Sequence, residues 1–547
     1  MQLQGQHVLI LGLGASGLAM ARWCARAGAE VSVADTRDAP PQLASLQAEW
    51  PSVRFIPGPL IAGLVEGTSV RAVFRSPGLA PEVVAPVVNA AQAMGLWQGG
   101  ELSLFAAALN DLNTRCAYQP HVLAITGTNG KTTVTSLTGQ LVARAGKSVQ
   151  VAGNIGPTML DTLTEALTQA QAQIDAQAEA DTQTEAVAEV PSPAESVSEQ
   201  AVPAAIQRHP LAAALPEVWV LELSSFQLDS SEGFEPTAAT VLNVSQDHLD
   251  WHGDMTAYAA AKARIFGLQT LMVLNREEPQ VMAMRPAPVR AKLQKPIERE
   301  CLLFGGDMPQ RPGDFGIEVA NGMTWLVRAL EADETRRRRK DQEDDLHIQR
   351  LIPADALRIR GRHNAVNALA ALALASSAGC ALGPMLYGLR EYRGEPHRVE
   401  PVAIIDGVEF FDDSKGTNVG ATVAALKGLG ADRRIVAILG GEGKGQDFSP
   451  LAEPISRFAR AVVLIGRDAP LIRAALQDSA APLHDAADMA SAVTLAAELA
   501  QGGDAVLMSP ACASFDMFDH YVHRAEVFVQ AVSELAEAAG VAMEGGL

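Results

Sequence analysis

The chain has 547 residues, enough for several domains with complete cores, and its 48% apolar content is typical of a globular enzyme. Its formal net charge of −20, with no basic stripe, argues against nucleic acid as the main partner. Five scattered cysteines without a CxxC pair favour a reducing cytoplasmic setting and argue against a thiolate metal site. The first residues lack the basic start of a signal peptide, so we expect none.

The run from Ala368 to Leu389 carries no charge and is long enough to cross a bilayer. It is rich in alanine and is interrupted by serine, glycine and proline residues. We therefore expect a buried helix followed by a turn, and no stable insertion into a membrane.

The N-terminal region has the pattern of a nucleotide-binding fold. An apolar strand at 8–11 leads into Gly12-Leu13-Gly14-Ala15-Ser16-Gly17, then a helix at 18–27, and the next strand at 30–34 ends at Asp35. This order of strand, glycine-rich turn, helix and acidic residue is typical of dinucleotide-binding domains. We expect a Rossmann-like domain over residues 1–118. The pattern does not say which nucleotide is bound, and it leaves an NAD-dependent dehydrogenase as one alternative.

A second phosphate-binding pattern follows the apolar run 122–125. The segment Thr126–Thr133 reads TGTNGKTT, so a strand leads through a glycine-rich turn into a helix. Backbone N–H groups, the helix N-terminus, Lys131 and a threonine hydroxyl suit a nucleotide triphosphate with Mg²⁺. Only two residues separate Gly127 from Gly130, whereas the usual loop has four between its glycines. The short loop narrows the class of ATP-using enzymes considerably.

Acidic and histidine side chains follow two further strands of the middle region. Glu222 lies at the end of the apolar run 218–223, where doubly wound sheets place ligands and where a carboxylate can hold Mg²⁺. His248 follows the expected strand 239–244 and has acidic neighbours in Asp247 and Asp250.

Lys262 lies among alanines in an expected helix over 258–266. One interpretation is a surface lysine with a buried stem. The other is a lysine with a perturbed pKa, unprotonated often enough to react or to ligate a metal.

The remaining pattern sets the domain limits. We expect a central ATP-binding domain over 119–394 and a C-terminal α/β domain over 395–547. An insertion at about 161–216 has nine acidic residues, one arginine and no aromatic residue; its first part could extend a helix, and 191–203 should be disordered. The charged patch 336–345 is expected to be a solvated loop or hairpin tip. Further strands are expected at 271–275, 435–439, 462–465 and 505–508.

Together these motifs resemble the Mur ligase family, the ATP-dependent amide ligases of peptidoglycan synthesis, over nearly the whole chain outside the insertion. The resemblance implies three α/β domains: a UDP-binding Rossmann-like domain, a P-loop ATPase-like central domain, and a dehydrogenase-like C-terminal domain. It further implies addition of D-glutamate to UDP-N-acetylmuramoyl-L-alanine through an acyl phosphate. The family's diaminopimelate-recognition motif, Asp-Asn-Pro followed by Arg, is absent.

The resemblance also implies roles for individual residues. The residues matching the ATP site are Gly127, Thr128, Asn129, Gly130, Lys131, Thr132, Thr133, Asn364, Asn367, Arg398, Asp413 and Lys415. Those matching the ligands of two Mg²⁺ ions are Thr132, Glu222, His248 and Lys262, the last as a carbamate formed with CO₂. The residues matching the catalytic groups are Lys131, His248 and Lys262.

The two substrates are matched by residues in the outer domains and by two central loops. The residues implied for the uridine nucleotide substrate are Ser16, Asp35, Thr36, Arg37, Gly78, Asn154 and Ser224. Those implied for D-glutamate are Thr417, Lys444, Ser514, Phe515 and Tyr521. A lysine and two hydroxyls suit a dianionic amino acid. At position 521 the family commonly has phenylalanine.

The resemblance leads us to expect a monomer whose C-terminal domain closes on the other two when nucleotide binds, excluding water from the acyl phosphate. The alternatives are a sister Mur ligase or a folylpolyglutamate synthase within the same superfamily, the dehydrogenase named above, and a non-catalytic nucleotide-binding regulator. The base that deprotonates the amine of D-glutamate is left open, with His248 as one candidate.

Overall fold

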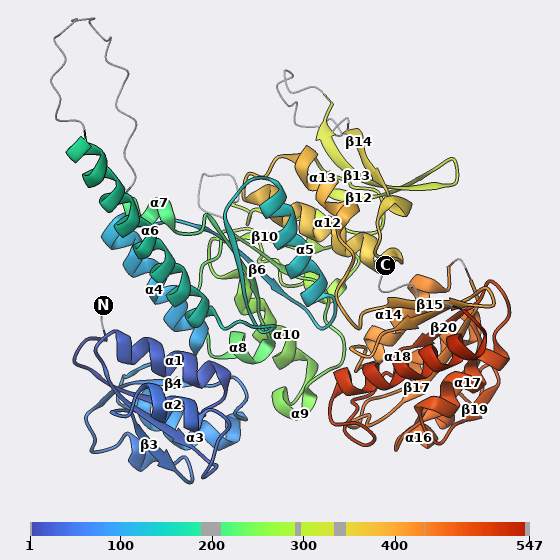
Figure 1. The fold of residues 1–547 in the computed structure, drawn as a ribbon, viewed down its shortest axis with the longest axis horizontal. Coiled ribbons are helices and arrows are strands. Elements are labelled where there is room, and N and C mark those ends of the chain that lie inside the picture. The colour runs from blue at the N-terminus through green and yellow to red at the C-terminus, as the bar shows by residue number, and fades with distance from the viewer. Residues whose placement is uncertain (1–2, 188–208, 290–296, 333–345, 432, 542–547) are drawn as a thin grey trace, which may run out of the picture.

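A computed structural model describes residues 3–187, 209–289, 297–332, 346–431 and 433–541. The chain forms three α/β units in sequence order, each built on its own mainly parallel sheet (Figure 1). This architecture confirms the expected fold class. The expected disorder at 191–203 and the charged patch at 336–345 lie outside the described residues, although the strands on either side of the patch pair as an antiparallel hairpin.

The N-terminal unit is a five-stranded parallel sheet of order β3-β2-β1-β4-β5. The sheet strands are β1 (His7–Leu11), β2 (Glu30–Asp35), β3 (Arg54–Pro57), β4 (Val70–Arg75) and β5 (Trp97–Gly99). The helices of this unit are α1 (Ala15–Arg26), α2 (Leu43–Glu49), α3 (Pro81–Ala93) and α4 (Glu101–Cys116). The inner strands β1, β2 and β4 are largely buried, as expected for a parallel sheet covered by helices, whereas the edge strands β3 and β5 are partly exposed.

The central unit contains a six-stranded parallel sheet of order β11-β10-β9-β6-β8-β7. Its strands are β6 (His121–Thr126), β7 (Val149–Gly153), β8 (Val218–Glu222), β9 (Ala238–Val241), β10 (Leu271–Asn275) and β11 (Cys301–Phe304). A three-stranded antiparallel sheet follows, with strands β12 (Phe315–Ala320), β13 (Met323–Glu331) and β14 (Leu346–Pro353). The helices near the site are α5 (Lys131–Arg144), α8 (Ser225–Asp229), α9 (Leu249–His252) and α10 (Met255–Ala263).

The C-terminal unit has a six-stranded sheet of order β15-β16-β20-β17-β18-β19, parallel except for the β15–β16 hairpin. Its strands are β15 (Glu400–Ile405), β16 (Val408–Asp412), β17 (Ile435–Gly440), β18 (Ala459–Ile465), β19 (Leu483–Asp485) and β20 (Ala505–Met508). Its helices are α14 (Val419–Leu429), α15 (Ala452–Phe458), α16 (Ala469–Ala475), α17 (Met489–Leu499) and α18 (Tyr521–Ala538).

The uncharged run 368–389 lies in the core of the central unit. It spans most of α12 (Arg362–Ser377), which is buried along nearly its whole length, and then a turn and a second helix, α13 (Leu382–Glu391). In the parts of the chain that the structure describes, no helix is both long and apolar enough to span a membrane.

The first part of the insertion forms helix α6 (Met159–Val187), as expected. Its first turns bury Met159, Leu160 and Leu163 against the core that includes α1 and α4, whereas the side chains of 171–180 are largely exposed. Figure 1 shows the far end of α6 projecting away from the three sheets. Among the residues of α6 whose side chains are described, only those in its first half are therefore packed against the core.

Some expected limits are wrong by a few residues. The strand expected at 239–244 ends at Val241, because Asn243 instead turns toward the phosphate loop and bonds to Asn129 through both its side-chain oxygen and nitrogen. The helix expected over 258–266 ends at Ala263 and tightens into a 3₁₀ turn over Arg264–Phe266.

We predict that Gly17→Ala destabilises the N-terminal unit. A Cβ at Gly17 would lie 2.0 Å from the Gly12 carbonyl oxygen, so α1 would have to move away from the turn after β1. Overpacking of this kind typically lowers the free energy of unfolding by about 1–3 kcal/mol. We expect a loss of about 2 kcal/mol or more for Gly17→Ala, measured by thermal unfolding. The matched control is Gly383→Ala in α13, where a Cβ meets no described atom within 4 Å and a helical alanine should be neutral or stabilising. Equal melting temperatures for the two variants would contradict the prediction.

Candidate functional site

The phosphate loop lies between the end of β6 and the start of α5. Gly127 and Gly130 both adopt positive φ, of 157° and 82°, which a residue with a Cβ rarely does. Lys131 folds back over the loop, and its Nζ donates to the carbonyl oxygens of Gly127 and Thr128 at 3.0 and 2.9 Å. Burial lowers the pKa of Lys131. The N-terminus of α5 and one partly buried amine therefore lie together at the loop, the combination that phosphate binding requires.

A cleft of about 650 Å³ lies between the phosphate loop and the carboxyl edge of the C-terminal sheet. The predicted residues that line this cleft are Thr128, Asn129, Gly130, Lys131, His248, Arg398, Lys415, Thr417, Lys444, Ser514, Phe515 and Tyr521. Residues expected to bind ATP, metal and D-glutamate are thus brought to one cavity, although they are up to 393 positions apart in the chain (Thr128 to Tyr521).

A smaller cavity of about 110 Å³ lies beside the cleft and is lined by Asn364, Asn367 and Asp413. A Cβ on Gly130 would lie 2.9 Å from the Asn367 side-chain oxygen, so the start of α12 contacts the phosphate loop directly. Burial raises the pKa of Asp413 to about 7, although the Ser509 hydroxyl and Arg398 oppose that shift. Three residues predicted for the ATP site, Asn364, Asn367 and Asp413, therefore share one cavity next to the loop.

Two hydrogen-bonded contacts join the C-terminal unit to the phosphate loop. Arg398 donates to the Thr132 hydroxyl at 2.7 Å. The Asn418 side-chain amide donates to the Asn129 side-chain oxygen at 3.1 Å, and a second bond of 3.4 Å runs in the opposite direction. The C-terminal unit thus contacts the loop through its own polar side chains.

Glu222 at the end of β8 has the environment of a cation ligand. Its side chain is 1% exposed, and Oε1 accepts a hydrogen bond of 3.0 Å from the Asn154 side chain. Its other oxygen, Oε2, is buried and accepts no hydrogen bond from any described residue. A buried carboxylate oxygen without a partner is costly unless a cation accompanies it, so the residue fits a divalent metal.

His248 precedes α9 with a φ of 53°, and its ring contacts Phe226 with centroids 4.7 Å apart. Burial lowers the pKa of His248, with Asp247 opposing and Lys131 reinforcing the shift. A lower pKa favours the neutral imidazole, which is the form that binds a metal.

Lys262 is buried rather than at the surface, so the interpretation of a snorkelling lysine is wrong. It is 1% exposed, its Nζ donates to the Gly127 carbonyl at 2.9 Å, and the same atom lies 4.6 Å from the centre of the Tyr258 ring. Burial, together with the charge of Lys131, shifts the pKa of Lys262 far below its usual value. This amine has the neutral character that a reactive lysine needs.

Three family models match successive parts of the chain. The Mur ligase MurD-like N-terminal domain matches residues 6–97, the Mur ligase middle domain 125–300, and the Mur ligase glutamate ligase domain 397–512. A curated UDP-N-acetylmuramoylalanine–D-glutamate ligase from Albidiferax ferrireducens is 65% identical over 543 residues, covering 99% of both chains. The chain belongs to the Mur ligase family.

A second relative with the same enzyme name, from Burkholderia mallei, is 52% identical over 544 residues and covers 97% of this chain and 98% of its own. The MurF ligase of Thermotoga maritima, solved in complex with ADP, has a TM-score of 0.51 at 15% identity, with 97% of this chain and 96% of that chain covered, and shares the fold. The predicted family, three-domain α/β fold and ligase class are confirmed. The dehydrogenase alternative for the Gly12–Gly17 motif is wrong, since the full-length relatives are ligases.

In this Mur ligase, the residues predicted to hold the uridine nucleotide lie outside the 650 Å³ cleft. Asp35 is buried at the end of β2 and accepts hydrogen bonds from the Leu13 N–H and from the backbone and side chain of Arg37. Burial would raise its pKa, but these bonds outweigh that effect and hold the pKa at about 2. Thr36, Arg37 and Gly78 are exposed around this turn. Among the described residues, this group does not line the 650 Å³ cleft.

Asn154 and Ser224 lie at the carboxyl ends of β7 and β8, next to Glu222. The Asn154 N–H donates to the Glu222 carbonyl at 2.8 Å, and Ser224 caps α8 through the backbone N–H of Gln227. Both residues therefore lie beside the candidate metal ligand and not with the N-terminal group.

Three further residues support the site, of which Asn243 and Arg524 had no predicted role. Asn243 accepts from the Asn129 N–H at 2.8 Å and donates to its carbonyl at 3.0 Å, while Asn418 forms the contact described above. Arg524 of α18 is 1% exposed and donates to the Ser414 and Cys512 carbonyls at 2.8 and 3.1 Å, tying two cleft loops together. An asparagine near the end of a buried apolar run was a usable signal for Asn243. Nothing in the sequence distinguishes Arg524 from other helical arginines.

Glu101 couples the N-terminal and central units. It is 2% exposed at the start of α4 and accepts a hydrogen bond of 3.0 Å from the Leu160 N–H of α6. Burial raises the pKa of Glu101 to about 7. Between about pH 4.5 and 7 the folded state therefore holds a proton that the unfolded state has released, so stability falls as pH rises through this range and the loss is complete above pH 7.

We predict that Glu101→Gln removes this pH dependence and stabilises the protein at pH 8 by an amount on the order of 3 kcal/mol. Glutamine cannot ionise but can still accept from Leu160. Urea unfolding of both proteins from pH 4.5 to 8 measures the difference, with Glu537→Gln on the exposed side of α18 as control. If the free energy of unfolding has the same dependence on pH in the wild type and in Glu101→Gln, the buried carboxyl does not titrate in this range.

Proposed function

We propose that this Mur ligase joins D-glutamate to UDP-N-acetylmuramoyl-L-alanine with cleavage of ATP to ADP and phosphate, in peptidoglycan synthesis. The observation that carries the proposal is the single cleft, which is lined by the phosphate-loop amine of Lys131 and also by Thr417, Lys444 and Ser514. Full-length relatives carry the name of this enzyme. The ADP in the Thermotoga maritima MurF structure supports the choice of nucleotide.

ATP would bind with its phosphates on Gly127–Thr133 and its adenosine toward the smaller cavity with Asn364, Asn367 and Asp413. Lys131, Arg398 and Lys415 line the cleft at the loop and supply positive charge where charge spreads over the transferred phosphoryl oxygens. Phosphoryl transfer depends mainly on such positioning and electrostatic stabilisation.

Thr132, Glu222 and His248 would hold two Mg²⁺ ions together with Lys262 as its CO₂-derived carbamate. Mg²⁺ when bound supplies charge neutralisation for the phosphate oxygens. The buried, unpartnered Oε2 of Glu222 and the neutral imidazole of His248 support these roles. The lowered pKa of Lys262 supports the carbamate, because only the neutral amine reacts with CO₂.

D-Glutamate would be held by its two carboxylates. Lys444 lies at a strand end with its Nζ 5.5 Å from the centre of the Phe515 ring, and Ser514 is 2% exposed on the opposite loop. The Lys415 Nζ lies 3.8 Å from the centre of the Tyr521 ring. Tyrosine at this position therefore provides an aromatic face that stabilises the lysine cation. A lysine and the hydroxyls of Thr417 and Ser514 match a dianion.

In the proposed reaction, the free carboxylate of the muramoyl substrate attacks the γ-phosphorus of ATP, and ADP leaves. The amine of D-glutamate then attacks the acyl carbon of the acyl phosphate, and inorganic phosphate leaves as the amide forms. Residues of the central and C-terminal units line the cleft together, so closure of the units would exclude water from the acyl phosphate. The limits 1–118, 119–394 and 395–547 for the units, a monomeric state and a cytoplasmic location remain predictions.

We predict that purified protein releases ADP with UDP-N-acetylmuramoyl-L-alanine and D-glutamate, and that Lys444→Ala raises the KM for D-glutamate at least tenfold. Loss of one charge-assisted contact of about 1.5–3 kcal/mol accounts for that factor. The control is Lys427→Ala, since Lys427 is exposed on α14 and pairs with Glu453. Release of ADP with L-lysine, diaminopimelate or L-glutamate, but not with D-glutamate, would overturn the assignment.

The carbamate predicts a specific rescue. Lys262→Ala should lose activity, because the variant cannot place an anion at this position, and a short carboxylate such as acetate should restore part of it. Full activity of Lys262→Ala without acetate would refute the carbamate. Lys262→Arg serves as the matched variant, because it keeps a hydrogen-bond donor for the Gly127 carbonyl but cannot form the carbamate and leaves no space for acetate.

A further inference from the structure

The segment between α13 and β15 has an unusual backbone. Gly394, His397 and Val399 adopt positive φ values of 94°, 63° and 49° within six residues. Positive φ is unfavourable for a non-glycine residue and especially so for a β-branched one, and it persists only where surrounding contacts enforce it. Arg398 lies between the two non-glycine residues and donates to Thr132 in the phosphate loop at 2.7 Å.

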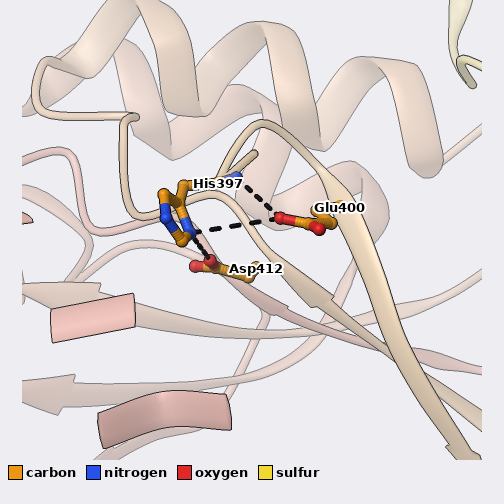
Figure 2. A group of neighbouring side chains, drawn as sticks. All are labelled: His397, Glu400 and Asp412. Carbon is orange, nitrogen blue, oxygen red and sulfur yellow. Dashed lines mark hydrogen bonds and ion pairs between the residues drawn. The ribbon is translucent and has the colours of Figure 1, made fainter. Parts of the chain in front are cut away.

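Four hydrogen bonds enforce this conformation. His397 Nδ1 lies 2.7 Å from Asp412 Oδ2, and the His397 backbone N–H donates to Glu400 Oε2 at 2.7 Å (Figure 2). From the loop that follows β16, the Lys415 N–H donates to the His397 carbonyl at 3.1 Å, and Asp413 Oδ1 accepts from the Val399 N–H at 3.3 Å. The bond to Asp412 also raises the pKa of His397.

The three side chains in Figure 2 are close enough together to suggest a metal site. Each already has a hydrogen-bond partner, however. Asp412 Oδ1 accepts from the backbone N–H and hydroxyl of Ser414 at 2.9 and 2.6 Å, and its Oδ2 is bonded to His397. Glu400 is occupied by the His397 backbone. These bonds connect the three side chains to one another and to the neighbouring backbone, which is the pattern of a hydrogen-bond network.

We propose that His397, Glu400 and Asp412 are positioning residues that hold Arg398 against the phosphate loop. The inference rests on the proposed function, since it gives Arg398 its role through the phosphates of ATP. The pairing joins two segments of the chain: His397 precedes Arg398, and Asp412 precedes Asp413, which lines the adjacent cavity. The single bond between His397 and Asp412 therefore sets the positions of both Arg398 and Asp413 around the nucleotide.

The experiment compares His397→Ala, His397→Asn and Arg398→Ala, with the double variant of His397→Ala and Arg398→Ala, in the ADP-release assay. His397→Ala should lower kcat/KM for ATP at least tenfold while changing the KM for D-glutamate less than twofold. The double variant should be no worse than Arg398→Ala within about twofold, because both changes remove the same interaction. His397→Asn should recover most of the activity, since asparagine tolerates positive φ and its amide can donate to Asp412.

The control is Asp406→Gly in the β15–β16 turn, an exposed residue that also has a positive φ, of 50°. This variant should keep wild-type activity. If His397→Ala does not fold, Glu400→Gln tests the same network and should lower kcat/KM for ATP by a smaller factor.

Multiplicative losses in the double variant would overturn the proposal, as would an inactive His397→Asn with an unchanged melting temperature. A stoichiometric transition metal found in purified wild-type protein and lost in His397→Ala would assign the cluster to an ion instead. Failure of the proposed function is distinguishable, because the wild type itself would then release no ADP with these substrates.

Discussion

The functional site depends on contacts that fix the conformation of the phosphate loop, because the glycines of the loop do not fix it themselves. Gly127 and Gly130 have the conformational freedom that lets the backbone turn its N–H groups toward a phosphate, and the same freedom would let the loop collapse. Lys262 fixes the Gly127 carbonyl from the buried side, and Asn243 fixes both polar backbone groups of Asn129. In the proposed carbamate one N–H would remain on Lys262, so the side chain would restrain the loop while presenting an anion.

The same loop also joins the units. Arg398 and Asn418 reach it from the C-terminal unit, so the shape of the loop and the width of the cleft are set by the same contacts. Arg524 performs a similar task within the C-terminal unit, where one buried guanidinium holds two cleft loops by their carbonyl oxygens. Its Nε has no hydrogen-bond partner among the described residues, so the arginine is retained at a cost in desolvation.

Residues at the carboxyl ends of strands and in the loops that follow them were predictable from the sequence, because strand, turn and helix are local and parallel strands bring their carboxyl ends to one edge. Glu222, His248 and the phosphate loop belong to this class. The burial of Lys262 was not predictable from its alanine-rich helix, since it depends on which face of α10 meets the loop. The pairing of Asp35 with Arg37 and the network around His397 were not predictable either. Each requires the positive φ or the side-chain geometry of a particular turn.

The charge of the chain explains why these restraints matter. A protein with a net charge of −20 repels nucleotides and acidic amino acids at a distance, so attraction must be local. Lys131, Arg398, Lys415 and Lys444 line one cleft, and a mutually repelling group of cations stays in place only if each is held separately. Lys131 is held by loop carbonyls, Lys415 and Lys444 lie over aromatic rings, and Arg398 is held by strained backbone and the Thr132 hydroxyl. Binding of the anionic substrates then reduces the electrostatic repulsion among these four cations, which is already present in the folded protein.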